Sequence, residues 1–287
     1  MLYLCATPIG NLQDVSLRLL EVLKSVDVVA CEDTRRTRLL LDRHGVSARL
    51  MSFHEHNEEQ RLAVLLPLLR EGKNVAVVSD AGMPGISDPG FTLVRACAGE
   101  GLAVTVVPGP SAVAAALALS GLPADRFAFA GFLARTKAKL LEQVATFDST
   151  GAAVVAFESP RRLKAALAAM AERWPARRLA VCRELTKLHE EVLRGTAAEV
   201  LTRLSDPVRG EVVLVLEPAG VAAGPGSGFR GANVAVERAD VEKALSALRE
   251  SGLGVKRAAA IVAELTGLPS RVVYAAAVEL REGVRKS

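Results

Sequence analysis

Several common signatures are missing from this 287-residue chain, and each absence argues against a class of protein. The four cysteines stand far apart in apolar runs without a Cys-x-x-Cys pair, which disfavours a zinc site or a disulfide framework. The glycine motifs of nicotinamide dehydrogenases and P-loop NTPases, the HExxH helix of zinc proteases and the GxSxG turn of hydrolases are also absent. The four histidines form no metal-binding pattern, so we expect no metal site.

Neither a secretory leader nor a membrane span is predicted. The first residues, Met1–Cys5, carry no basic region. The uncharged stretch 101–124 is interrupted by Pro108-Gly109-Pro110, which leaves pieces too short to cross a bilayer. Lys and Arg exceed Asp and Glu by 36 to 32, and the net charge of +4 permits an RNA partner without requiring one. We therefore expect a cytoplasmic protein.

What the chain does contain is an alternation of apolar β-type runs and helical stretches, with half of its residues hydrophobic. Five strands are predicted early in the chain, at Leu2–Ala6, Val26–Cys31, Arg49–Phe53, Val75–Ser79 and Val104–Val107. Their spacing predicts a mostly parallel sheet covered by helices. Five more are predicted at Phe127–Phe132, Ala153–Phe157, Leu179–Leu185, Glu191–Arg194 and Val212–Leu216. These lie closer together towards the end, which predicts a mixed sheet.

The fold class predicted is α/β, with two α/β domains and a small helical C-terminal extension. We place the first domain at residues 1–120 and the second at 121–218. A stretch rich in Gly, Ala and Pro, residues 219–231, indicates a linker. The last part, 232–287, contains three predicted helices, at Ala239–Glu250, Val255–Thr266 and Arg271–Glu282.

Rigid Gly/Pro loops follow three of the early strands: Thr7–Asn11, Asp80–Gly90 and Pro108–Ala112. The carboxyl ends of parallel strands meet at one edge of a sheet, where open α/β folds hold their ligands. The second loop suits a purine and ribose, and the amides of a helix beginning near Ser111 suit a carboxylate. The residues therefore predict a pocket for a nucleoside with a charged amino-acid tail, without deciding which nucleotide it is.

These loops and the motifs between them resemble the tetrapyrrole-methylase superfamily, and within it the branch that methylates small-subunit ribosomal RNA. The matching segments run in order over about residues 2–218: Ala6–Asp14, Cys31–Thr37, Ser52–Glu58, Val78–Gly90, Pro108–Ala112, Phe157–Arg162, Cys182–Lys187 and Arg209–Glu211. Met83 departs from the family, which usually carries Thr there. The resemblance implies S-adenosylmethionine as methyl donor, held between two α/β domains, and a homodimer. It also implies that the acceptor is the 2′-hydroxyl of a cytidine in the decoding region of 16S rRNA, within the small ribosomal subunit.

The resemblance also suggests which residues hold the donor. Those expected to line the donor cleft are Pro8, Asp80, Ala81, Gly82, Ile86, Ser111, Ala112, Phe157 and Pro218. Those expected to contact RNA are Arg35, Arg36, Lys187, Lys256, Arg257, Arg271 and Tyr274. For the catalytic role of taking the ribose proton we select Asp33 and His54, although Asp33 also fits the start of a helix.

Two other functions remain open on the sequence alone. One is a methyltransferase of the same superfamily that acts on a tetrapyrrole ring, and the other is a non-catalytic RNA-binding module. RNA as substrate is favoured by the charged cluster Glu32–Arg36, by the net positive charge and by the C-terminal extension. The intact loops favour an enzyme over a binding module.

Overall fold

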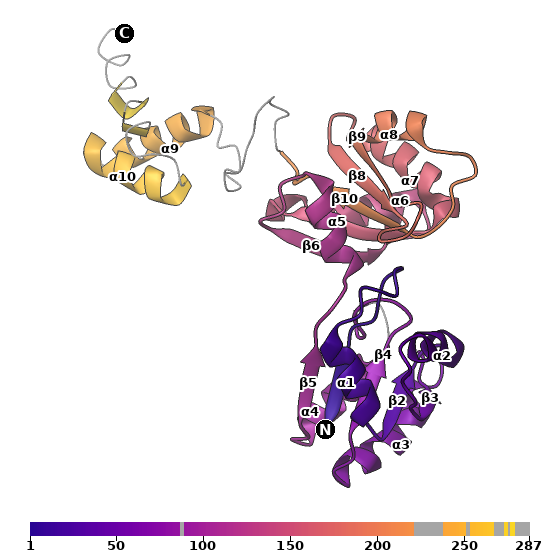
Figure 1. Cartoon of the computed structure of the whole chain (residues 1–287). Helices are drawn as coiled ribbons and strands as arrows, with labels where there is room; N and C mark the ends of the chain where they lie inside the picture. The colour runs from indigo at the N-terminus through magenta and orange to yellow at the C-terminus, as the bar shows by residue number, and fades with distance from the viewer. Residues whose placement is uncertain (87–88, 221–237, 251–252, 267–272, 275, 279–287) are drawn as a thin grey trace. The chain divides into compact units, whose positions relative to one another are not determined.

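The early apolar runs form a parallel five-stranded sheet in the computed structural model (Figure 1). Its strands are β1 (Leu2–Cys5), β2 (Val28–Cys31), β3 (Leu50–Ser52), β4 (Val75–Val78) and β5 (Val104–Val107). Their order is β3-β2-β4-β1-β5, and every neighbouring pair is parallel. Strands β2 and β4 are buried along their whole length, as expected where helices cover both faces. The predicted parallel sheet is confirmed.

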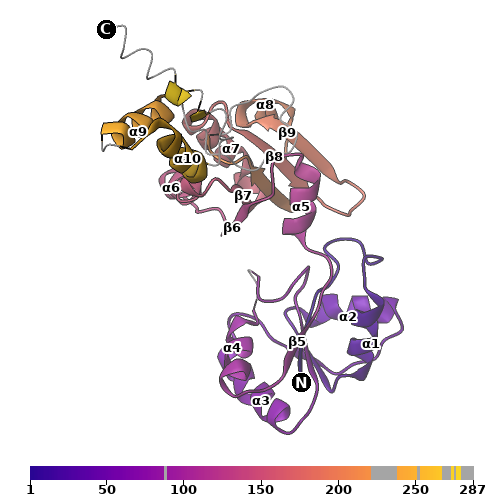
Figure 2. The same cartoon turned by 90° about the vertical axis from the view of Figure 1, so that its left-hand side faces the viewer.

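Four helices cover this first sheet, two on each face, as Figure 2 shows. They are α1 (Leu17–Ser25), α2 (Thr34–Arg43), α3 (Glu58–Arg70) and α4 (Phe91–Gly99). Leu23 of α1 and Leu41 of α2 share one apolar cluster with Val29 and Val78. The other face packs α3 and α4 through a separate cluster. Because the five strands are parallel, all the loops that follow them emerge at one edge of the sheet.

The later runs form a second five-stranded sheet that is mixed, as predicted. Its strands are β6 (Phe127–Phe132), β7 (Ala153–Glu158), β8 (Arg178–Arg183), β9 (Glu191–Thr196) and β10 (Val212–Leu216). Strand β10 lies at the centre of the order β6-β7-β10-β8-β9, antiparallel to both of its neighbours. Its first residues therefore lie at the same edge as the last residues of β7 and β8.

Helix α5 (Ala112–Ser120) packs on the second sheet, where Ala116 and Leu117 contact an apolar cluster that includes Val155 and Val215. The change from one sheet to the other therefore lies before Ala112. The domain bounds 1–120 and 121–218 stay a prediction. Helices α6 (Lys137–Ala145), α7 (Pro160–Arg173) and α8 (Ala197–Arg203) lie on the other face, with α7 between its two neighbours (Figure 2).

The structure describes residues 1–86, 89–220, 238–250, 253–266, 273–274 and 276–278. Met1–Thr146 and Ala153–Glu217 form one unit, which holds both sheets. Phe147–Ala152, with the short helix η1 (Asp148–Thr150), and the described chain from Pro218 onward form the second unit. Across the described ranges, no helix has the length and apolar character needed to cross a bilayer.

Two of the three predicted C-terminal helices are confirmed, as α9 (Arg238–Glu250) and α10 (Val255–Thr266). They share a small apolar core that includes Leu245, Ala258 and Val262. The third, predicted at Arg271–Glu282, falls largely outside the described residues, as does the predicted linker beyond residue 220.

Candidate active site

Two cavities that share part of their lining lie at the edge of the first sheet where its strands end. Their volumes are about 440 Å³ and about 280 Å³. The residues that line both are Ile9, Arg36, Asp80, Ala81 and Glu211. Loops following β1, β2 and β4 thus meet residues that precede β10 of the second sheet.

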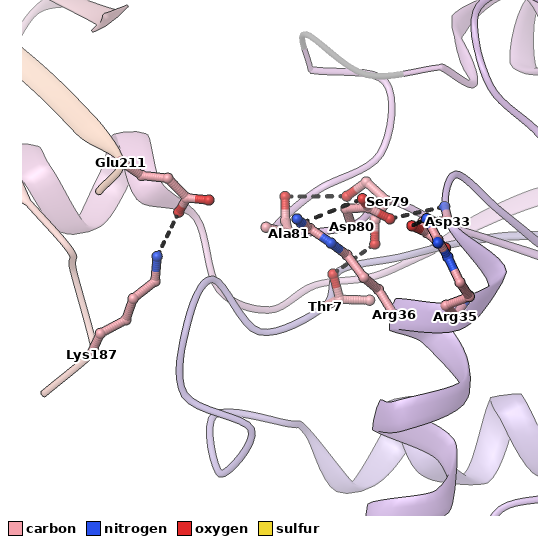
Figure 3. A network of polar contacts seen from close by, with 9 residues as sticks. All are labelled: Thr7, Asp33, Arg35, Arg36, Ser79, Asp80, Ala81, Lys187 and Glu211. Carbon is pink, nitrogen blue, oxygen red and sulfur yellow. Dashed lines mark hydrogen bonds and ion pairs between the residues drawn. The ribbon is translucent and has the colours of Figure 1, made fainter. Parts of the chain in front are cut away.

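The loops after β1 and β4 are joined to each other by backbone hydrogen bonds. The Thr7 amide donates to the Gly82 carbonyl (2.9 Å), and the Gly82 amide donates back to the Thr7 carbonyl (3.1 Å). Gly82 has φ +81°, a backbone conformation that a glycine adopts without strain. The hydroxyls of Thr7 and Ser79 add further bonds to carbonyls of the β4 loop (Figure 3). These bonds fix the part of the site formed by Pro8 and Ala81.

Asp80 connects the end of β4 to the end of β2. One oxygen of its carboxylate accepts the Asp33 amide (3.0 Å), and the other pairs with the Arg36 guanidinium at 3.4 Å (Figure 3). Asp80 lines both cavities, so its carboxylate is available to a ligand held there. Because it is already fixed by two contacts, its position requires no rearrangement on binding.

Helix α5 begins at the larger cavity. Ser111 is its N-cap, and the Ser111 hydroxyl accepts the Ala114 amide at 3.4 Å. Ser111, Ala112 and Val113 all line the larger cavity. The first amides of a helix have no partner within the helix, so this end of α5 can bind a carboxylate.

Apolar surface is left uncovered in the same cavity. Ile86 is 47% exposed and Phe132 is 61% exposed, although both are large hydrophobic residues. The rings of Phe132 and Phe157 meet edge to face, with their centroids 5.5 Å apart. Aromatic and aliphatic walls of this kind suit a flat purine ring. The larger cavity therefore fits the nucleoside with a charged amino-acid tail that the sequence predicted.

The second sheet contributes a group of charged residues to the smaller cavity. Lys187 Nζ donates to Glu184 (2.8 Å) and to Glu211 (3.0 Å). Burial works to lower the pKa of Lys187, but its hydrogen bonds to the two carboxylates and their charge outweigh burial and raise that pKa. Lys187 is therefore a fixed cation. Gly10 approaches it so closely that a Cβ at that position would lie 2.6 Å from Lys187 Cγ.

Most of the residues expected to bind the donor lie at these cavities. Those that line the larger one are Asp80, Ala81, Gly82, Ile86, Ser111, Ala112 and Phe157, and Pro8 lines the smaller one. Pro218 lines neither. Val212 and Val213, the first residues of β10, line the larger cavity, whereas Pro218 follows the opposite end of that strand. Its assignment to the donor cleft stays a prediction.

The two residues predicted to take the proton line neither cavity. Asp33 caps α2, and both of its carboxylate oxygens are bound by the Arg35 guanidinium at 3.1 and 2.9 Å. Hydrogen bonds from the Arg35 side chain and backbone lower the pKa of Asp33 to about 2, which makes it a weak base at neutral pH. His54 follows β3, the edge strand, and its Nε2 contacts the Asn57 side chain at 3.1 Å.

Three carboxylates that do line the cavities, Glu32, Glu158 and Glu211, were not selected from the sequence. All three stand in motifs that the sequence analysis quoted. Glu211 differs from other acidic residues in standing directly before β10. That position marks it as a site residue only when the antiparallel direction of β10 is known.

The residues expected to contact RNA fall into two groups. Arg36 lines both cavities, Lys187 lines the smaller one, and Arg35, next to Arg36 in the chain, is 90% exposed. Lys256 and Arg257 are exposed on α10, and Tyr274 is exposed as well. Arg271 lies outside the described residues.

Comparison with known proteins identifies the family. The family described as Tetrapyrrole (Corrin/Porphyrin) Methylases matches residues 1–201, and the RsmI C-terminal HTH domain matches 235–281. A protein of Mesorhizobium japonicum named ribosomal RNA small subunit methyltransferase I is 41% identical, covering 98% of this chain and 92% of that protein. A protein of the same name from Escherichia coli O157:H7 is 39% identical, covering 97% of this chain and 94% of its own length.

Solved structures agree with this result. A uroporphyrin-III-C-methyltransferase from Thermus thermophilus is 25% identical with a TM-score of 0.51, covering 75% of this chain and 93% of that chain. A diphthine synthase reaches a TM-score of 0.60 at 15% identity, covering 76% and 90%, and so shows a shared fold alone. The predicted fold class is confirmed, and the methyl donor of the family is S-adenosylmethionine. The chain belongs to the tetrapyrrole methylase family, in the branch whose members are named ribosomal RNA small subunit methyltransferase I.

Proposed function

We propose that this protein transfers a methyl group from S-adenosylmethionine to the ribose 2′-hydroxyl of a cytidine in the decoding region of 16S rRNA. The observation that carries the proposal is the lining of the larger cavity, which combines the start of α5, an apolar wall and the Asp80 carboxylate. Relatives of nearly full length are named for methylation of small-subunit rRNA.

Each part of the lining has a role in holding the donor. S-adenosylmethionine supplies a methyl group already activated by its sulfonium charge. The amides at the start of α5 receive its carboxylate, and Ile86 and Phe157 pack on the adenine. The Asp80 carboxylate accepts hydrogen bonds from the donor's hydroxyl groups. The protein contributes mainly by alignment, which supplies up to about 7–11 kcal/mol in favourable reactions.

Exposed cations beside the cavity suit the acceptor strand. Arg35 and Arg36 contact the phosphates next to the acceptor nucleotide, and Asp33 holds Arg35 in place for this purpose. Lys256, Arg257 and Tyr274 of the C-terminal unit provide further RNA contacts. The homodimer implied by the family resemblance is part of the same proposal, and light scattering of the purified protein tests it.

The experiment supplies the purified full-length protein with S-adenosylmethionine labelled in the methyl group and three acceptors. These are assembled small subunits, naked 16S rRNA and a porphyrin precursor. We expect label in 16S rRNA at one cytidine, with the following phosphodiester bond resistant to alkaline cleavage. Label in the porphyrin precursor, or donor binding without any transfer, would refute the proposal and favour one of the two alternatives stated above.

A further inference from the structure

Glu184, Lys187 and Glu211 form a fixed set of charges between β8 and β10. Glu184 has φ +50°, and its Oε1 accepts both the Glu211 amide (2.9 Å) and Lys187 Nζ (2.8 Å). Gly210, at φ +85°, allows this arrangement because a Cβ there would lie 2.4 Å from the Glu184 carboxylate. The backbone and side chain before β10 are thus held in one position.

One oxygen of Glu211 remains open within this network. Oε2 binds Lys187, whereas Oε1 accepts no hydrogen bond from any residue that the structure describes. The Glu211 side chain is 67% exposed, and it lines both cavities. Figure 3 shows the Glu211 carboxylate directed towards Ala81 and Asp80.

The other titratable groups at the cavities are less suited to accept a proton. The hydrogen bonds of Lys187 to two carboxylates raise its pKa against the effect of burial, so that it stays protonated. Asp80 already binds an amide and Arg36, and Glu158 is paired with Arg162. Glu32 lines only the larger cavity, and no described residue holds its side chain in a fixed position.

We propose that Glu211 takes the proton of the acceptor hydroxyl, and that Lys187 and Glu184 are the residues that position it. This inference rests on the proposed function. As the hydroxyl oxygen attacks, its bond to the methyl carbon forms while the carbon–sulfur bond of the donor breaks, and that electron pair stays on sulfur. The hydroxyl proton passes to Glu211 Oε1 and from there to water. General base catalysis of this kind typically contributes about 10²–10⁴-fold to the rate.

The test compares full-length wild-type protein with Glu211→Gln in single-turnover methylation of small subunits at saturating donor. We expect the rate of Glu211→Gln to fall by about 100-fold or more. Its affinities for S-adenosylmethionine and for rRNA, measured by calorimetry and filter binding, stay at the wild-type values. The wild-type rate is flat with pH around neutrality, whereas the Glu211→Gln rate rises by about tenfold per pH unit, because hydroxide must then take the proton.

Two further variants separate catalysis from structure. Glu190→Gln removes a nearby carboxylate that, among the residues the structure describes, binds only the Thr186 amide and lines neither cavity, and we expect it to keep the wild-type rate. Lys187→Gln lowers the rate but keeps the flat pH profile, since Glu211 is retained. A wild-type rate for Glu211→Gln overturns the inference, as does a lowered rate with a flat pH profile. If wild-type protein leaves no alkali-resistant bond in the rRNA, the proposed function itself fails.

Discussion

Asp27 and Asp80 connect the same two strands at opposite edges of the first sheet. The Asp27 carboxylate accepts the Asn74 amide (2.8 Å) before β2 and β4 begin, and the Asp80 carboxylate accepts the Asp33 amide (3.0 Å) after they end. Each also pairs with a basic side chain, Lys73 or Arg36. The two aspartates are alike in local structure, but only Asp80 lines the cavities.

This pair allows donor binding to be separated from stability. We expect Asp80→Asn to weaken S-adenosylmethionine binding by about tenfold or more, since hydrogen bonds to a charged acceptor contribute roughly 1.5–3 kcal/mol. Asp27→Asn should leave the affinity unchanged, because it alters an equivalent contact at the far edge of the sheet. Calorimetry measures the affinities, and denaturant unfolding checks that both variants lose a similar, small part of their stability. Equal affinities for the two variants would contradict a role for Asp80 in donor binding.

At the scale of single residues, most of the residues predicted to hold the donor line the two cavities, whereas the two predicted catalytic residues and Pro218 do not. Pro8, Asp80 and Ser111 follow strands of one parallel sheet, so their meeting at one edge follows from strand direction alone. Glu211 and Pro218 lie at the two ends of β10, whose direction in the mixed sheet the sequence does not state. Asp33 was selected as the proton acceptor although it also fits the start of a helix, and the structure shows it at that helix start with both carboxylate oxygens bound by Arg35.

At the scale of elements, the apolar runs predicted the strands closely. Val104–Val107, Phe127–Phe132 and Val212–Leu216 have the predicted bounds, and other ends differ by one or two residues, as at β2. The insertion of β10 between β7 and β8 was not predicted, because pairing between distant segments depends on packing of the whole layer. The same reason explains α5, whose apolar residues suit either sheet but pack on the second.

Helices α1 and α5 begin in the same way, with a serine N-cap. The Ser16 hydroxyl accepts the Leu19 amide (3.1 Å), and the Ser111 hydroxyl accepts the Ala114 amide (3.4 Å). Both helices have nine residues and no acidic residue in the first turn. Only the start of α5 lines a cavity, so a comparison of the two caps isolates the contribution of this helix end to ligand binding.

We expect Ser16→Ala and Ser111→Ala each to lower the free energy of unfolding by about 1 kcal/mol, the usual contribution of such a cap. Ser111→Ala should also weaken S-adenosylmethionine binding by about fivefold, the factor that corresponds to 1 kcal/mol. The physical reason is that the first amides of α5 lose their fixed direction when the cap is removed. Urea unfolding and calorimetry on the same preparations give both values. A donor affinity that changes equally in the two variants would show that the start of α5 has no special role.

At the scale of the whole molecule, the chain combines a donor-binding unit with a separate helical unit that has its own core. Val241 and Leu245 of α9 pack with Ala259 and Val262 of α10, and this core includes no residue of either sheet. Residues 235–281 match the RsmI C-terminal HTH domain. Lys256 and Arg257, both exposed near the start of α10, give this unit a basic surface suited to RNA phosphates.

Neutralising that surface should weaken RNA binding without affecting the donor site. The quantity measured is the slope of the logarithm of rRNA affinity against the logarithm of salt concentration. In the double variant Lys256→Gln with Arg257→Gln this slope should become less steep by about 1.5, because each lost phosphate contact removes roughly 0.7–0.9. The matched control, Lys24→Gln with Lys73→Gln, removes the same charge from the edge of the first sheet where the strands begin. Filter binding over a range of salt concentrations measures the slopes, and calorimetry confirms unchanged donor affinity. If both double variants change the slope equally, the C-terminal helices act only through net charge, and their proposed contact with RNA is wrong.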